Sequence, residues 1–108
     1  MNSYFKNKNV VITGASKGIG FELVNTLLKK GANVVGIART KSLLDDIEKI
    51  SEEFPGNFRG VEGDMADRDF VFQAMEDILE DFGTIDVLIN NVGGSLVGPL
   101  LDAKKEEI

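Results

Sequence analysis

The side chains able to carry out chemistry in this chain are few. Its 108 residues include no histidine, no cysteine and a single tyrosine, Tyr4. These absences exclude a Ser-His-Asp triad, a cysteine nucleophile, a zinc-finger ligand set and a disulfide framework. Ser16 and Ser95 are not expected to act as nucleophiles, because no histidine is present to activate them. Any chemistry must therefore rely on tyrosine, lysine, carboxylates or a bound cofactor.

The most informative segment is the run T-G-A-S-K-G-I-G at residues 13–20, where the glycines are spaced G-x-x-x-G-x-G. It follows an apolar run and leads into a segment with helical periodicity. Glycines in such a turn permit a tight bend, let the backbone approach a phosphate, and let the helix lie close to the strand. The helix start then offers free N–H groups to an anion. The spacing alone also fits a turn without ligand, and it matches neither G-x-G-x-x-G nor a P-loop.

Strand and helix patterns alternate along the chain in the order βαβαβαβ. Short apolar runs at residues 9–13, 33–38, 57–62 and 87–89 predict four strands. Apolar stripes within residues 23–28, 43–54 and 71–82 predict three helices that pack against a core, with Phe72 and Leu79 widening the third stripe. Asp67 is expected to cap the third helix and Gly83 to end it.

This alternation favours an α/β fold with a Rossmann-like doubly wound parallel sheet, truncated after the fourth strand. Ligands of such sheets bind at the carboxyl ends of the strands. The turns after Thr13, Ala38 and Asn90, and the segment around Asp64, are therefore expected to line one rim.

Three motifs in this order resemble the short-chain dehydrogenase/reductase family. Residues 13–20 resemble its T-G-x-x-x-G-I-G turn, and residues 90–93 resemble its Asn-Asn-Ala-Gly motif, with Val92 in place of alanine. Asp64-Met65 resembles the pair whose carboxylate accepts a hydrogen bond from the adenine of the cofactor. The resemblance covers residues 10–98 and implies a single partial NAD(P)-binding Rossmann domain over residues 1–108. The implied cofactor-binding residues are Gly14, Ser16, Lys17, Gly18, Ile19, Gly20, Arg39, Asp64, Met65, Asn90, Val92 and Gly93.

The end of the second strand favours NADP(H) over NAD(H). In dinucleotide folds an acidic residue there binds the ribose hydroxyls, whereas an arginine accommodates a 2′-phosphate. The sequence reads Ile37-Ala38-Arg39-Thr40, with no carboxylate to repel a phosphate and a guanidinium to bind it. Lys17 resembles the basic residue of NADP-preferring members, and Thr40 or Ser42 offers a hydroxyl.

The resemblance implies hydride transfer between a nicotinamide cofactor and a carbonyl or alcohol. The family's catalytic serine and Tyr-x-x-x-Lys lie beyond the point where this chain ends, so we expect the chain alone to be inactive. Tyr4 and Lys8 match Tyr-x-x-x-Lys literally, but they precede the first strand and are expected at the opposite end of the sheet. The alternative is a non-catalytic nucleotide-binding or interaction module with the same fold.

Charge and hydropathy limit the partners that we expect. The net charge is −6, and residues 55–108 carry most of the acidic side chains, so nucleic-acid binding is not expected. No targeting segment and no apolar run of membrane-spanning length is present, which predicts a cytoplasmic protein without membrane contact. Residues 87–89 are expected to form an exposed apolar edge that self-associates or pairs with a missing C-terminal half.

Overall fold

The computed structural model describes residues 4–15 and 18–91. Ser16, Lys17, Val92, Gly93, Ser95 and the C-terminal tail lie outside the described residues. The secondary-structure elements confirm the predicted alternation, and the fourth strand extends one residue beyond the predicted run. They are β1 (Asn9–Thr13), α1 (Gly18–Lys29), β2 (Asn33–Ala38), α2 (Lys41–Ser51), β3 (Asn57–Glu62), α3 (Arg68–Phe82) and β4 (Val87–Asn90).

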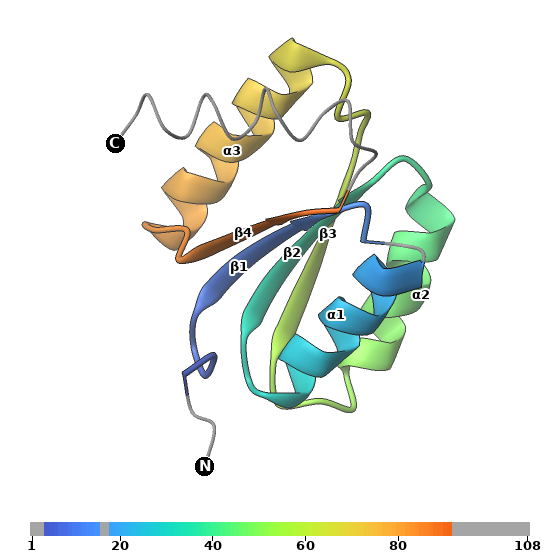
Figure 1. Cartoon of the computed structure of the whole chain (residues 1–108), viewed down its shortest axis with the longest axis vertical. Helices are drawn as coiled ribbons and strands as arrows, with labels where there is room; N and C mark the ends of the chain where they lie inside the picture. The colour runs from blue at the N-terminus through green and yellow to red at the C-terminus, as the bar shows by residue number, and fades with distance from the viewer. Residues whose placement is uncertain (1–3, 16–17, 92–108) are drawn as a thin grey trace.

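The four strands form one parallel sheet in the order β3-β2-β1-β4. Helices α1 and α2 cover one face of this sheet and α3 covers the other (Figure 1). The doubly wound arrangement predicted from the sequence is therefore confirmed.

The core has two halves, one on each face of the sheet. In β1, Val10 and Ile12 pack on the side of α1 and α2, whereas Val11 packs on the side of α3. All three side chains are fully buried. A strand covered on both faces needs apolar residues at consecutive positions, which explains why β1 reads as a continuous run instead of an alternation.

Two of the predicted helical stripes are partly wrong. In α3 the buried residues are Ala74 and Ile78, while Phe72 is 63% exposed and Leu79 is 45% exposed. Successive helical residues are rotated by about 100°, so Phe72 lies about 200° from Ala74 and points away from the sheet. The buried face of α3 is therefore narrower than the apolar stripe that the sequence predicts.

In α2 the buried face matches the predicted stripe of Leu43, Ile47, Ile50 and Phe54 only at Ile47. Leu44, Ile47 and Ser51 are buried, whereas Ile50 is 38% exposed. The cause is a close approach to β3, where a Cβ on Gly60 would lie 2.9 Å from the Cβ of Leu44. This close contact turns the Leu44 side of the helix, not the Leu43 side, toward the sheet.

The ends of α3 are as predicted. The Asp67 carboxylate accepts a hydrogen bond from the Phe70 N–H at 3.2 Å, which is the contact of an N-cap residue. Gly83 ends the helix with φ +85° and donates its N–H to the Leu79 carbonyl. Within residues 4–15 and 18–91, no helix has the length and apolar character needed to cross a membrane.

Candidate cofactor-binding site

The carboxyl ends of the strands meet at one rim, as the sequence predicts. Thr13 at the end of β1 is level with Ile37 of β2 and Asn90 of β4. Just beyond β1, the Gly14 N–H donates to the Ile37 carbonyl at 2.9 Å and the Ala15 N–H donates to it at 3.3 Å. The turn after β1 is thus held against the end of β2, beside the segment that contains Arg39.

The glycines of this turn have different structural roles. Gly14 and Gly18 have positive φ angles of +67° and +54°, a region that glycine enters without the strain of a side chain. Gly20 is buried in the first turn of α1, and a Cβ there would lie 2.1 Å from the Gly14 carbonyl oxygen. Glycine at position 20 therefore lets α1 start directly against the turn. Among the described residues, no atom lies within 4 Å of the place of a Cβ on Gly18, so these residues leave this side of the turn open.

A hydrogen-bond network joins this turn to the end of β4. The buried Thr13 hydroxyl donates to the Asn90 carboxamide oxygen at 2.8 Å and accepts from the Asn91 N–H at 3.0 Å. The Asn91 carboxamide in turn donates to the Gly14 carbonyl at 3.4 Å. The network fixes the glycine motif and the asparagine motif relative to one another. Thr13 and Asn90, which it joins, are 77 residues apart in sequence.

Three side chains at the rim are exposed to solvent. Ile19, at the start of α1, is 68% exposed. Arg39 follows β2 directly, is exposed, and forms no ion pair with any described residue. Thr40 is the N-cap of α2, but its side chain makes no capping hydrogen bond. The rim therefore presents an aliphatic surface, a guanidinium and a hydroxyl.

Asp64 and Met65 follow β3 at the same rim and differ in burial. The Asp64 carboxylate is exposed, and its Oδ1 accepts the Ala66 N–H at 2.9 Å in a tight local turn. Met65 is 7% exposed and packs in the core half beside α3. Burial of Met65 holds the backbone of the segment in place and leaves the Asp64 side chain at the surface.

Tyr4 lies at the opposite end of the sheet, as predicted. Its neighbour Asn7 donates its N–H to the Gly31 carbonyl before β2, and the Asn33 N–H donates to the Lys8 carbonyl. The Tyr4 ring is stacked edge-to-face on Phe5 and lies 5.2 Å from the Lys8 ammonium. The Tyr-x-x-x-Lys match is thus a packing unit at the amino ends of the strands.

Sequence reasoning missed two residues that shape the rim, Thr13 and Asn91. Both belong to the motifs that it identified, but neither was assigned a role, because a motif does not show which of its residues touch another motif. The available signal was the type of residue at position 13. A threonine at the end of a fully buried strand needs a hydrogen-bond partner.

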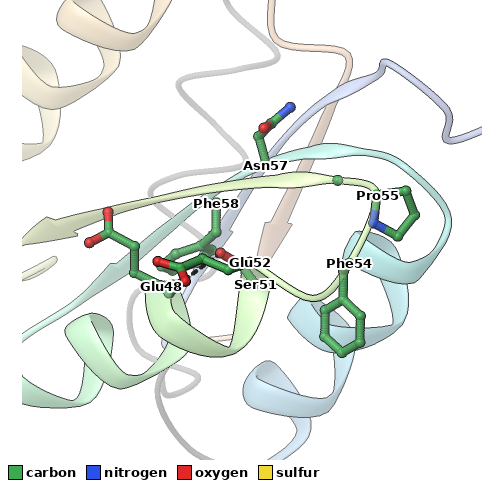
Figure 2. Close-up of a pocket in the computed structure, with 8 residues that line it drawn as sticks. Glu48, Ser51, Glu52, Phe54, Pro55, Asn57 and Phe58 are labelled. Atoms are coloured by element: carbon green, nitrogen blue, oxygen red, sulfur yellow. Dashed lines mark hydrogen bonds between the residues drawn. The ribbon is translucent and has the colours of Figure 1, made fainter.

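A hollow lies away from the rim, at the amino end of β3. Figure 2 shows the hollow between the end of α2 and the start of β3, with Glu48 and Glu52 on its α2 side. Two exposed carboxylates make this hollow a poor host for a phosphate. Among the described residues, no group of three or more acidic, histidine or cysteine side chains is placed to hold a metal ion.

The fold and the rim define a class of protein. A doubly wound parallel sheet with a glycine-rich turn between β1 and α1 is the first half of a dinucleotide-binding Rossmann fold. Residues 8–108 match the family model described as short chain dehydrogenase. The chain belongs to the short-chain dehydrogenase/reductase family.

Individual relatives and structures agree with this assignment. The chain is 37% identical over 106 residues to carbonyl reductase [NADPH] 2 from Sus scrofa, covering 98% of this chain and 40% of that protein. It superposes on L-sorbose reductase from Gluconobacter frateurii, complexed with NADPH and L-sorbose, with a TM-score of 0.80. The two sequences are 33% identical, and the match covers 86% of this chain and 36% of the reductase. NAD+-bound xylitol dehydrogenase gives a TM-score of 0.78, 27% identity, and coverage of 83% and 35%. The chain spans about two fifths of the length of the curated relatives that it matches.

Proposed function

We propose that residues 1–108 form one partial domain, the NADP(H)-binding portion of a short-chain dehydrogenase/reductase. Such an enzyme transfers a hydride between a nicotinamide cofactor and a carbonyl or alcohol. The observation that supports this proposal most directly is the turn after β1, held by Thr13 and Gly14 against the ends of β2 and β4. Its open side at Gly18 and the N-terminus of α1 provide the setting that a pyrophosphate requires.

The residues at the rim suit the remaining parts of a dinucleotide. The Oδ2 atom of Asp64 has no hydrogen-bond partner among the described residues, so it is available to an adenine amino group. Exposed Ile19 offers an apolar contact to a ring. When bound, the cofactor supplies the hydride; the described residues bind and orient it. Ser16, Lys17, Val92 and Gly93 complete the set of residues that we propose for cofactor binding.

The choice of NADP(H) rests on the end of β2. The similar structures hold different cofactors, NADPH in L-sorbose reductase and NAD+ in xylitol dehydrogenase. In this chain Ala38 is buried and Arg39 is exposed directly after it, with no carboxylate at either position. A guanidinium forms paired hydrogen bonds with a phosphate, which favours the cofactor that carries a 2′-phosphate.

Replacing Arg39 with aspartate is expected to weaken NADPH binding about tenfold or more, because a phosphate partner is removed and a repelling charge is added. NADH lacks the 2′-phosphate, so its affinity should change far less. Fluorescence titration with both nucleotides measures the two dissociation constants, and the chain has no tryptophan to interfere. Unmodified protein should bind NADPH more tightly than NADH.

The matched control for this experiment is Lys49→Asp. Lys49 is exposed in the last turn of α2, at the far end of that helix from Arg39, and the substitution changes the net charge by the same amount. It should leave both dissociation constants unchanged. Equal affinities for NADPH and NADH in the unmodified protein would contradict the cofactor assignment.

We also propose that the chain self-associates through β4 or pairs there with the other half of the fold. Within the described sheet, β4 is an edge strand, and its residues Val87, Leu88 and Ile89 are only half-buried. An apolar edge strand offers unpaired backbone groups to another strand.

Placing a charge on this edge should reduce self-association. Leu88→Lys is expected to shift the population toward monomer in sedimentation velocity, because a lysine on an edge strand opposes strand pairing. Glu62→Lys places the same side chain on β3, the other edge strand, and should leave the distribution unchanged. A monodisperse monomer for the unmodified chain would rule out self-association.

A further inference from the structure

Three asparagines form a ladder across the amino ends of the sheet. Asn9, Asn33 and Asn57 are the first residues of β1, β2 and β3, and they are paired in register. The Asn57 carboxamide donates to the Asn33 carboxamide oxygen at 3.0 Å, and the Asn33 carboxamide donates to that of Asn9 at 3.1 Å. Stacked identical amides of this kind are also found in cross-β assemblies, where the strands are in register.

The segment before β4 holds the end of this ladder. The Asn9 carboxamide donates to the Thr84 carbonyl at 3.1 Å. The Asn9 N–H donates to an Asp86 carboxylate oxygen, and the Asp86 N–H donates to the Asn9 carbonyl, both at 2.8 Å. One line of polar contacts therefore runs from β3 through β2 and β1 to the segment before β4, at the end of the sheet opposite the cofactor rim.

The paired valines of β1 and β2 by themselves specify the register of these two strands weakly. Adjacent valines in β1, Val10 and Val11, face opposite sides of the sheet, and β2 repeats the pattern with Val34 and Val35. A slip by one residue exchanges the faces but still buries a valine on each side. The strand pair thus has apolar residues to bury in either register.

The asparagines distinguish the registers. After a slip of one or two residues toward the rim, Asn33 would lie beside Val10 or Val11, which are fully buried. Its carboxamide would lose the partners on both neighbouring strands and enter an apolar region, where an unpaired amide is unfavourable. Only the observed register pairs all three carboxamides.

We propose that the Asn9–Asn33–Asn57 ladder specifies the register of β1, β2 and β3. The ladder sets the relative heights of the residues that follow these strands, Gly14, Arg39 and Asp64. A slip of one residue would move one of these segments by about 3.3 Å along the sheet. The ladder is thus a positioning device for the rim, although no ladder residue lies there.

The test is Asn33→Val in the whole chain. Valine favours strands more than asparagine does, so at an ordinary solvated strand start this substitution would leave stability unchanged or raise it. We expect instead that the folded-to-unfolded ratio, measured by urea unfolding, falls about tenfold because two side-chain hydrogen bonds are lost. We also expect more than one set of amide signals for β1 and β2 in a two-dimensional 1H–15N spectrum, reporting more than one register.

Two further variants keep the test decisive if Asn33→Val folds poorly. Asn57→Val removes one bond at the exposed end of the ladder, so it should lower the folded-to-unfolded ratio less than Asn33→Val does. Glu62→Val, at the other exposed end of β3, should leave this ratio unchanged. The effects of Asn33→Val and Asn57→Val should not add, since both remove the same bond. A single set of amide signals in Asn33→Val and Asn57→Val overturns the proposal, whatever their stability.

Discussion

Replacing Gly20 with alanine is expected to have the largest effect of any substitution at the rim. The new Cβ would lie 2.1 Å from the Gly14 carbonyl oxygen and 2.7 Å from the Asn91 carboxamide nitrogen. The nearer atom belongs to the backbone, so the start of α1 must move away from the turn. We expect a loss of about 3 kcal/mol in the free energy of unfolding, at the upper end of overpacking effects. Urea unfolding measures this loss.

The control is Gly18→Ala, in the same turn. Gly18 has a positive φ, but within residues 4–15 and 18–91 no atom lies within 4 Å of the place of its Cβ. Alanine there strains the backbone but contacts no neighbouring atom, and we expect a loss of about 1 kcal/mol in the free energy of unfolding. If Gly18→Ala destabilises the protein as much as Gly20→Ala, the close approach of α1 to the turn is not the reason for glycine at position 20. Nucleotide titration of both variants then shows whether the displaced helix start also weakens binding.

Thr13→Val is expected to uncouple the glycine turn from the end of β4. Valine retains the branched shape but removes the hydroxyl that donates to Asn90 and accepts from the Asn91 N–H. Because Thr13 is fully buried, water cannot readily replace the hydroxyl. We expect a loss of about 2 kcal/mol in the free energy of unfolding, since the half-buried Asn91 N–H loses its acceptor. Hydrogen exchange at the Asn91 amide should become faster.

Thr13→Ser is the matched variant, because it keeps the hydroxyl and loses only a methyl group. Its expected cost is about 1 kcal/mol, the effect of one deleted buried methyl. Slow exchange at the Asn91 amide should persist in this variant. Equal exchange rates at Asn91 in Thr13→Val and Thr13→Ser would show that the hydroxyl does not protect this amide.

Much of the fold was predictable because the signals are local. The first three strands begin and end at the predicted residues, and the ends of α3 at Asp67 and Gly83 were identified from residue type alone. A cap or a helix terminator acts on its own helix end through hydrogen bonds within a few residues. The order of the rim segments also followed from the sequence, since parallel strands all point toward the same edge.

The buried faces of the helices were predicted less well. Phe72 and Leu79 of α3 and Ile50 of α2 are apolar residues at helical spacing, and all three are exposed. Spacing shows that a helix has an apolar side, but the direction that is buried depends on the surface beneath it. In α2 that surface is Gly60, whose missing side chain admits Leu44.

Residue types and their local spacing therefore determined the alternating strands and helices, the glycine turn, the rim and the family. The tertiary structure decided which residues meet across the sheet: Thr13 with Asn90 and Asn91, and Asn9 with Asn33 and Asn57. These partners are 24 to 78 residues apart in sequence. Strand register brings them together, and register is a property of the assembled sheet that no single strand contains.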